Sequence, residues 1–320
     1  MTREVNAEHS LLALSESLVS AVETAGHSVV GVAARRRGAA SGVHWQPGVV
    51  VTADHAVEQD EDIKLILEDG TRHAAKLAGR DSTTDLAVLR LEGERLRPTA
   101  AINAEAVKAG RLVVAVGRPG DGGVSVSFGA VSAVSGAWRT WAGGKIDQLV
   151  RPDVTFYPGF SGGPLVDMAG RVLGINTSGL SRHMSLTIPA ATVNRVVEQL
   201  LRTGRIARGY LGLRMQSVVL PEASRAQLGL ESGTGLVVMG VEPDGPASGA
   251  GILLGDILVA IDGNALAHSD AVQAALDPET VGKPVTLSVI RGGSPMQVTV
   301  TVGERPRRER HHRGGRHHHG

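Results

Sequence analysis

The 320-residue sequence contains no cysteine, which excludes disulfide bonds, thiolate catalysis and cysteine-ligated zinc sites. This absence does not by itself indicate a redox compartment. Aromatic residues make up only 2% of the chain, whereas glycine occurs 42 times and short runs of Val, Ile and Leu recur along the sequence. That combination favours a mainly β chain with tight turns.

Long apolar runs and an excess of charge are also absent. No stretch approaches the ~20 apolar residues of a membrane-spanning helix. Charged residues interrupt residues 1–26, and the run Leu11–Leu14 is too short for a signal peptide. We therefore expect no membrane segment, no export signal and, by default, a cytoplasmic location. The net charge of +1 also predicts no nucleic-acid partner.

Charge is uneven at the C-terminal end of the chain. From Arg305 to Gly320 the sequence has six Arg and five His against one Glu. A segment rich in Arg and His could bind a divalent metal ion or a polyanion, but such low complexity is more typical of a solvated, disordered chain end. We therefore expect residues 304–320 to be disordered.

The spacing of apolar residues predicts the order of the elements. Apolar residues three to four positions apart indicate an amphipathic helix within residues 1–26. Two clusters of short strands follow, over residues 27–99 and 111–189, and a helix is expected over 191–201. Adjacent strand clusters of this kind predict paired β-barrels within residues 27–203.

A further unit is expected over residues 209–303, after a polar linker at residues 204–208. It contains strand-like runs, a Gly-Pro turn at Gly245–Pro246 and a short helix near Ser269–Leu276. A length of 320 residues accommodates two or three domains.

The most unusual stretch runs from Tyr157 to Leu165 and reads YPGFSGGPL. Glycine adopts backbone angles closed to other residues and lets other atoms approach closely. Such a loop can hold the hydroxyl of Ser161 forward and aim backbone N–H groups at a point beside it. Acyl transfer needs this combination of a nucleophile and an oxyanion site, although most glycine-rich turns are only turns.

A serine nucleophile needs a base that a third group orients. His55 is the candidate base, because it lies just past the Val-rich run of residues 48–53, which leads to Asp54 and His55; His73, on an expected exposed hairpin, is its competitor. Asp85 is the candidate orienting group, because a carboxylate that opens an apolar strand must be hydrogen-bonded. Asp81 is its nearby rival.

The order His55, Asp85, Ser161 is the order found in chymotrypsin-like double barrels. The first two residues fall in the first strand cluster and the serine falls in the second, so the three groups would meet between the barrels. The sequence therefore predicts a mainly β fold, with a chymotrypsin-like double β-barrel followed by a third unit.

Three motifs resemble those of the HtrA/Deg family of trypsin-like serine proteases with a C-terminal PDZ domain. They are VTADHAV at residues 51–57, DSTTDLAVL at 81–89 and GFSGGPL at 159–165. In the third unit, Arg208–Leu213 and residues 250–258 resemble the carboxylate-binding loop and the central motif of PDZ domains. The likeness extends over residues 15–303.

The resemblance implies ATP-independent hydrolysis of peptide bonds in unfolded or exposed protein segments, without a metal or cofactor. Ser161 would attack the scissile carbonyl, His55 would move the proton and Asp85 would orient the imidazole. The backbone N–H groups of Gly159 and Ser161 would form the oxyanion hole.

The resemblance also implies binding partners and a location. Tyr210, Leu211, Gly212 and Leu213 would bind the C-terminal carboxylate of a peptide that adds as a strand. Family members commonly work outside the cytoplasm. They often form trimers through an N-terminal segment bearing aromatics, whereas residues 1–40 contain no aromatic residue. A homo-oligomer is therefore expected from the resemblance alone.

Two segments depart from the family pattern. Phe160 stands where the family usually has Asn, and residues 185–189 (SLTIP) replace its Gly-Phe-Ala-Ile-Pro segment beside the primary pocket. Ile175, Leu180 and Leu186 predict a small or medium aliphatic side chain before the cut.

Two alternatives stay open at this point. The aromatic cluster of Phe156, Tyr157 and Phe160 permits a catalytically inactive, peptide-binding or chaperone-like protein on the same fold. A weaker alternative is an adaptor whose PDZ domain binds partners while the barrels serve as a scaffold. A fluorophosphonate label on Ser161 would separate the protease from both.

Overall fold

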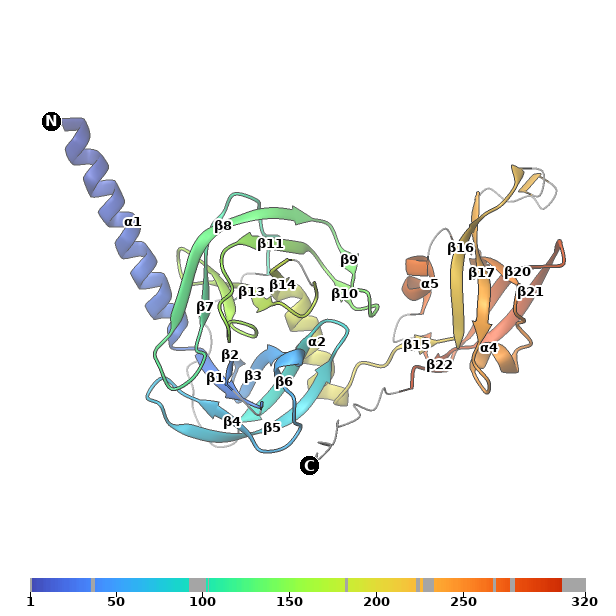
Figure 1. Cartoon of the computed structure of the whole chain (residues 1–320), viewed down its shortest axis with the longest axis horizontal. Helices are drawn as coiled ribbons and strands as arrows, with labels where there is room; N and C mark the ends of the chain where they lie inside the picture. Colours follow the sequence, from blue (N-terminus) through green and yellow to red (C-terminus); the bar gives the residue numbers. More distant parts are fainter. Residues whose placement is uncertain are drawn as a thin grey trace, which may run out of the picture. The chain divides into compact units, whose positions relative to one another are not determined.

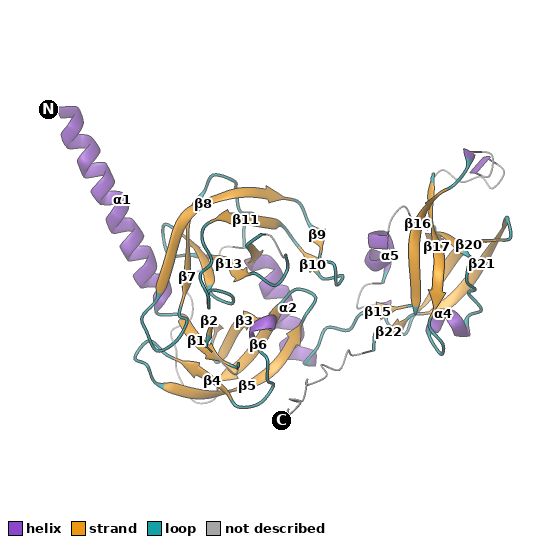
Figure 2. Ribbon diagram, viewed as in Figure 1, coloured by secondary structure: helices purple, strands orange, loops and turns teal. Residues whose placement is uncertain are grey.

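The computed structural model describes residues 2–35, 38–91, 102, 104–181, 184–222, 225–226, 233–266, 269–276 and 280–306. The chain divides into two compact units, Met1–Ile206 and Ala207–Gly320. Figure 1 traces the elements of each unit in chain order, and Figure 2 shows that strands dominate both.

The first unit begins with a closed antiparallel barrel whose strands lie in the order β1-β2-β3-β6-β5-β4. Its strands are β1 (Val29–Ala33), β2 (Ala40–Gln46), β3 (Val49–Ala53), β4 (Ile63–Ile66), β5 (Arg72–Asp81) and β6 (Leu86–Leu91). Successive side chains of a strand point to opposite faces. Val50 accordingly packs in the interior of this barrel, whereas Val49 and Val51 pack in a cluster shared with the second barrel. Both faces of β3 are therefore buried.

The second barrel is also closed and antiparallel, in the order β11-β14-β13-β12-β7-β8. Its strands are β7 (Leu112–Gly117), β8 (Ser125–Ser135), β11 (Leu149–Asp153), β12 (Pro164–Asp167), β13 (Val172–Thr177) and β14 (Leu186–Pro189). A hairpin of β9 (Trp138–Arg139) and β10 (Lys145–Ile146) lies between β8 and β11 along the chain. Phe160, Leu165 and Leu173 belong to the core of this barrel.

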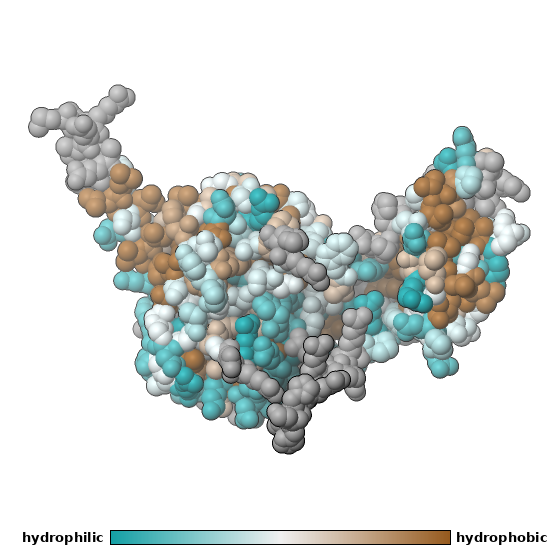
Figure 3. Space-filling model, in the orientation of Figure 1, coloured by the Kyte–Doolittle hydropathy of each residue, from teal (hydrophilic) through white to brown (hydrophobic). Residues whose placement is uncertain are grey.

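Helix α1 (Thr2–Gly26) contacts β7 and β12 of the second barrel. Ala21 and Ala25 are buried in this contact, whereas Leu11 and Leu12 are 69% and 59% exposed. Figure 3 shows apolar residues gathered along α1 and the adjoining face of the barrel. No helix in the described ranges is long and apolar enough to span a bilayer.

Helix α2 (Ala190–Thr203) contacts both barrels, through β5 and β6 on one side and β13 and β14 on the other. Its apolar face is buried in the cluster that the two barrels share. The helix ends at Gly204, whose φ of 71° allows its N–H to bond the carbonyl of Leu200 at 2.8 Å. The Gly204 carbonyl lies so close to Gly79 that a Cβ there would come within 2.5 Å of it.

The second unit is built on an antiparallel sheet in the order β16-β17-β18-β20-β21, with β19 paired to β18. These strands are β16 (Leu213–Val219), β17 (Thr234–Val241), β18 (Ile257–Ile261), β19 (Asn264–Ala265), β20 (Pro284–Arg291) and β21 (Ser294–Thr301). A two-stranded ribbon joins β15 (Gly209–Tyr210) to β22 (Gly303–Glu304), and the helices are α4 (Pro246–Gly249) and α5 (Ser269–Ala275). Leu236, Leu258 and Leu287 lie at the centre of its core.

The structure confirms the predicted mainly β double barrel and the predicted helices, which are α1, α2 and α5. Three details of the sequence prediction are wrong. Gly245 closes the expected turn, because its N–H bonds the carbonyl of Glu242 at 3.1 Å, but the sequence prediction missed α4, which starts at Pro246, where the fixed φ of proline and its missing N–H suit the first helical position. The strand expected near residues 146–150 is divided between β10 and β11. The third is the start of the expected disordered end, because Glu304 belongs to β22; from residue 307 onward this segment lies outside the described residues.

Candidate active site

His55 and Asp85 form the centre of the candidate site. His55 lies in the 3-10 turn η1 (Asp54–Ala56), directly after β3, and Asp85 directly precedes β6, which pairs with β3. The Nδ1 atom of His55 is 2.8 Å from Oδ2 and 3.0 Å from Oδ1 of Asp85, and the His55 backbone N–H donates to Oδ1 at 2.9 Å. This carboxylate therefore holds both the backbone and the ring of the histidine.

The backbone at Asp85 is unusual, because its φ of 57° lies in the left-handed region. Asp81, its rival in the sequence, does not meet His55. The carboxylate of Asp81 accepts hydrogen bonds from Thr83 and from the hydroxyl of Thr84, at 2.6 and 2.7 Å, and so shapes the turn that leads to Asp85. His73, the other competitor, lies on β5 with its Nε2 3.1 Å from the hydroxyl of Thr71.

Arg80 fastens the turn that carries His55. Its guanidinium forms an ion pair with the buried carboxylate of Asp54 and donates to the carbonyls of Asp54 at 2.9 Å and Val57 at 2.7 Å. Asp54 lies within the motif at residues 51–57, where the sequence analysis gave it no role, and Arg80 lies outside the three motifs. Their neighbourhood arises because β5 and β6 pair beside β3 in the closed barrel.

The second barrel completes the environment of the histidine and the aspartate. Thr177, at the end of β13, donates its hydroxyl hydrogen to Oδ2 of Asp85. A Cβ at Gly179 would lie 2.6 Å from both the Asp85 carboxylate and the His55 ring, so only glycine fits this position. The pair is therefore enclosed by residues from both barrels.

The loop before Ser161 is a tight turn. The N–H of Phe160 bonds the carbonyl of Tyr157 at 3.0 Å, and Gly159 has a φ of 90°. Pro158 followed by a residue with positive φ is typical of a type II turn. Within the ranges that the structure describes, the N–H groups of Gly159 and Ser161 donate no hydrogen bond. Two donors that flank one residue are therefore free to bind an oxyanion.

Ser41 supports this loop from the first barrel. Its hydroxyl donates to the carbonyl of Gly159 at 2.6 Å, and its N–H donates to the carbonyl of Ser161 at 3.1 Å. Because both carbonyls are bound on the side of Ser41, they do not occupy the position beside the two free N–H groups. The sequence analysis missed Ser41, since no local pattern marks it.

Phe160 is fully buried in the core of the second barrel. Its ring stands edge-on to Tyr157, with ring centroids 5.4 Å apart, and a Cβ at Gly117 would come within 2.8 Å of it. The side chain that departs from the family pattern is therefore an apolar anchor that holds the turn to the core of the second barrel.

The hydroxyl of Ser161 lies 3.1 Å from the hydroxyl of Ser178. Between Ser161 and His55, both of which are described, the structure has no hydrogen bond. The sequence analysis did not single out Ser178, which follows Thr177 on the segment after β13. In the structure the Ser161 hydroxyl therefore pairs with Ser178, whereas catalysis would require it to donate a hydrogen bond to His55.

The three residues expected to line the primary pocket differ in exposure. Ile175 is fully buried in the cluster shared by the barrels, Leu186 is 3% exposed, and Leu180 packs against that cluster while partly accessible. Of the three, Leu180 offers the most surface to a substrate. The structure brings Ile175 and Leu180 into one cluster.

The loop expected to bind a carboxylate connects β15 to β16 in the second unit. Gly212 has a φ of 79°, and its carbonyl accepts a hydrogen bond from Glu242 at 2.8 Å, while the Leu211 carbonyl accepts one from Ala247 at 2.9 Å. Strand β16, which begins at Leu213, pairs with β17 and with no other strand among the described residues, and it contacts α5. An open strand edge beside a helix is where an added peptide strand would lie.

Tyr210 is held at the start of that loop by its hydroxyl, which bonds the carboxylate of Glu242. Burial, together with this acceptor, raises the pKa of Tyr210 to about 12. Tyr210 therefore stays neutral at physiological pH and acts as a hydrogen-bond donor.

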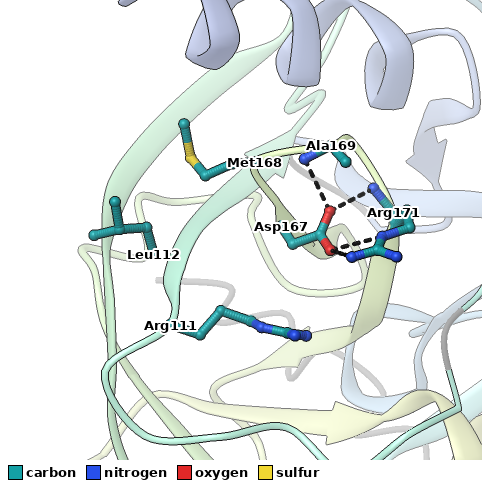
Figure 4. Close-up of a pocket in the computed structure, with 6 residues that line it drawn as sticks. All are labelled: Arg111, Leu112, Asp167, Met168, Ala169 and Arg171. Carbon is teal, nitrogen blue, oxygen red and sulfur yellow. Dashed lines mark hydrogen bonds and ion pairs between the residues drawn. The ribbon is translucent and has the colours of Figure 1, made fainter. Parts of the chain in front are cut away.

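A separate cavity of about 380 Å³ lies on the second barrel and contains none of the candidate catalytic residues. Figure 4 shows it between Arg111, Leu112 and Met168 on one side and the Asp167–Arg171 pair on the other. Burial raises the pKa of Asp167, but hydrogen bonds from Arg171 and Ala169 outweigh it and leave that pKa below its ordinary value. The Asp167 carboxylate thus accepts hydrogen bonds from residues 169 and 171 of the turn that it begins.

Two family models match the chain. Residues 40–175 match the trypsin-like peptidase domain, and residues 209–302 match the PDZ domain. A protein of Halomonas elongata named "probable periplasmic serine endoprotease DegP-like" is 34% identical over 277 residues, which cover 85% of this chain and 57% of that protein. "Protease Do-like 1, chloroplastic" of Arabidopsis thaliana is 32% identical over 290 residues, covering 84% of this chain and 64% of that protein.

The chain thus spans less than two thirds of the length of these curated relatives. Among solved structures, an HtrA-type protease, AlgW, with a tripeptide has a TM-score of 0.73 and 30% identity, covering 91% of this chain and 98% of that one. A serine endoprotease from Yersinia pestis has a TM-score of 0.73 and 29% identity, with coverages of 90% and 98%.

Proposed function

The chain belongs to the HtrA/Deg family of trypsin-like serine proteases with a C-terminal PDZ domain, and we propose that it is a serine endopeptidase. Its substrates would be unfolded or exposed protein segments, cut without ATP. The observation that carries this proposal is the contact of 2.8 Å between His55 and Asp85, next to a turn with two free N–H groups.

In this mechanism the hydroxyl of Ser161 leaves Ser178 and donates to Nε2 of His55. The Ser161 oxygen then attacks the scissile carbonyl while His55 takes its proton. Asp85 keeps the imidazole in the tautomer that carries a proton on Nδ1 and stabilises the imidazolium that forms. The proton passes to the leaving amine, and water then hydrolyses the acyl-enzyme by the same steps.

The oxyanion of the tetrahedral intermediate would bind the N–H groups of Gly159 and Ser161. Loss of one such donor typically costs about 2.7–4 kcal/mol of transition-state stabilisation. The buried ring of Phe160 and the hydroxyl of Ser41 support this assignment, because they fix the turn from opposite sides. The inactive alternative gains no support from the comparisons, since the relatives carry the names of proteases.

The substrate contacts follow from the same arrangement. Leu180, which packs against the cluster that contains Ile175, and the buried Leu186 favour a small or medium aliphatic side chain before the cut. In the second unit, Tyr210, Leu211, Gly212 and Leu213 would receive the C-terminal carboxylate of a peptide that adds beside β16. Profiling the cleaved bonds tests the first assignment, and titration with apolar C-terminal peptides tests the second.

Compartment and assembly are further parts of the proposal. The relative from Halomonas elongata is named a periplasmic enzyme, which favours a location outside the cytoplasm over the cytoplasmic default and can be tested by cell fractionation. The exposed leucines of α1, such as Leu11 and Leu12, favour a homo-oligomer. Sedimentation of the purified chain measures its mass.

The deciding experiment is casein cleavage by the purified protein and by Ser161→Ala, at several pH values between about 5 and 9, the range in which histidine titrates. Cleavage by the unaltered protein alone, together with fluorophosphonate labelling of Ser161, is the expected result. Absence of both cleavage and labelling would overturn the proposal.

A further inference from the structure

Among the described residues of the first unit, the most exposed large hydrophobic side chain is an aromatic one. Trp141 is 99% exposed, whereas Trp45 is 4% exposed and Trp138 is partly buried. Tryptophan has a large apolar surface, and it is strongly enriched among the residues that dominate binding interfaces. A fully solvated Trp in a chain with only 2% aromatic residues therefore calls for a binding role.

The backbone that presents Trp141 is held firmly. Trp141 occupies a turn at the tip of the β9–β10 hairpin, closed by the N–H of Gly143, which bonds the carbonyl of Thr140 at 2.8 Å. The N–H of Gly144 bonds the Thr140 hydroxyl at 3.0 Å, and Arg139 donates to the Gly143 carbonyl at 3.2 Å. Thr140 is only 6% exposed. The indole is thus presented by a rigid support rather than by a loose loop.

The hairpin is fastened beside the candidate active site. The Thr140 hydroxyl donates to the carbonyl of Thr83 at 2.6 Å, and a Cβ at Gly144 would come within 2.3 Å of that carbonyl oxygen. Thr83 lies two residues before Asp85. Figure 1 shows the hairpin reaching from the second barrel toward the loop between β5 and β6 of the first.

We propose that Trp141 is a substrate-binding residue that packs on an apolar or aromatic side chain of the polypeptide held at the Ser161 site. The occupant would be the unfolded segment of the proposed function, because the hairpin that carries Trp141 is bonded to Thr83, two residues before Asp85. This inference rests on the proposed function. A rigid aromatic anchor favours binding, because little conformational entropy is lost when its partner arrives.

Binding can be measured without catalysis, in the full-length chain carrying Ser161→Ala. The probe is a fluorescently labelled ten-residue peptide rich in Leu and Phe, with an amidated C-terminus, so that the second unit has no carboxylate to bind. Trp141→Ala is expected to weaken its binding about tenfold, a loss larger than most interface residues cause when truncated. Trp141→Phe should retain most of the affinity.

The matched control is Phe128→Ala, which removes an aromatic side chain that is 44% exposed on β8. Its peptide affinity should equal that of the parent. Equal affinities of the Trp141→Ala variant and the parent would overturn the inference, whatever the catalytic activity. A change only in the concentration dependence of sedimentation would also overturn it, because the partner would then be a second copy of the chain.

Kinetics separate this inference from the proposed function. Trp141→Ala should raise the KM for casein several-fold and leave the rate of fluorophosphonate labelling of Ser161 unchanged. An unchanged KM with normal labelling contradicts the inference and leaves the protease intact. Failure of the unaltered protein to label contradicts the proposed function, and the peptide-binding result then still decides the role of Trp141.

Discussion

At the scale of single residues, hydroxyl groups determine how the candidate catalytic side chains are held. Thr177 donates to Asp85, Ser41 donates to the carbonyl of Gly159, and Ser178 contacts Ser161. Each neutral hydroxyl can donate and accept, so it adjusts to the charge of its partner. The contact between the two serines has the most direct consequence for reactivity, because it competes with the contact that the mechanism needs.

Ser178→Ala is expected to accelerate fluorophosphonate labelling of Ser161. Removing a net hydrogen bond of roughly 0.5–1 kcal/mol corresponds to an increase of about two- to fivefold. The labelling rate at fixed pH measures this change, with Ser135→Ala, at the exposed end of β8, as the control. A slower or unchanged rate would mean that Ser178 does not compete with His55 for the nucleophile.

The sequence allowed the principal residues to be predicted because each lies in a continuous motif. His55 follows a Val-rich strand, Asp85 opens an apolar strand and Ser161 lies among glycines. Thr177 and Arg80 could not be found in this way. Their roles depend on closure of the two barrels, which brings β13 and β5 beside the histidine, and no local pattern encodes that neighbourhood.

At the scale of elements, the turn before Ser161 depends on the strand barrel beneath it. Phe160→Ala removes a fully buried ring from the core of the second barrel. We expect the free energy of unfolding of the first unit to fall by about 3–5 kcal/mol, as for other buried aromatic truncations. Urea denaturation followed by Trp fluorescence, in the Ser161→Ala background, measures it.

Phe128→Ala serves as the comparison for Phe160→Ala, because Phe128 is 44% exposed on β8. Its loss should reduce stability far less. Similar losses for the two variants would show that Phe160 does not anchor the turn through burial.

An ion pair holds the second unit together at the start of β18. Asp256 is 2% exposed, and its carboxylate accepts hydrogen bonds from Arg291 at 2.7 and 2.8 Å and from the N–H of Leu253 at 2.8 Å. The hydrogen bonds from Arg291 keep the pKa of Asp256 below its ordinary value of 3.8, although burial opposes them. The ionised form therefore stabilises the folded unit above that pH.

This stabilisation should be lost as the pH falls below 3.8 and through the lowered pKa of the folded state. Asp256→Asn should lower the protection of β18 and β20 against hydrogen exchange at neutral pH. The difference in hydrogen-exchange protection between Asp256→Asn and the parent should shrink as the pH falls below 3.8, because Asp256 of the parent then also loses its negative charge. Asp121→Asn, an exposed residue of the first unit, is the control. A difference that stays constant with pH would contradict the assignment.

Elements were predictable in proportion to the strength of their pattern. The strands β3 and β6 and the amphipathic helix α2 were predictable because the spacing of their apolar residues in the sequence is typical of a buried strand or of a helix. The two-residue strands β9 and β10 carry no period, and α4 is too short to show one. These elements exist because tertiary hydrogen bonds fix them, as Thr140 does for the hairpin.

At the scale of the whole molecule, the chain consists of two compact units that meet in sequence near Ile206. Arg205, just after α2, is exposed. Within the described part of the chain, brief trypsin treatment of the Ser161→Ala protein should cut there before it cuts within the strands, since buried, hydrogen-bonded backbone resists proteolysis. Mass spectrometry of the first fragments gives the cut, and early cleavage inside β-strands of either unit would contradict this division.

Helix α2 carries a consequence for how the protein is made. The ribosome releases β5 and β6 first, then Ser161, and only afterwards the helix that contacts β5, β6, β13 and β14. Contacts that join the two barrels through α2 cannot form until residues beyond Thr203 have left the exit tunnel. The nascent chain therefore emerges with its reactive groups on two barrels that meet first through direct contacts such as Thr177 to Asp85, and the helix that reinforces their association is translated last.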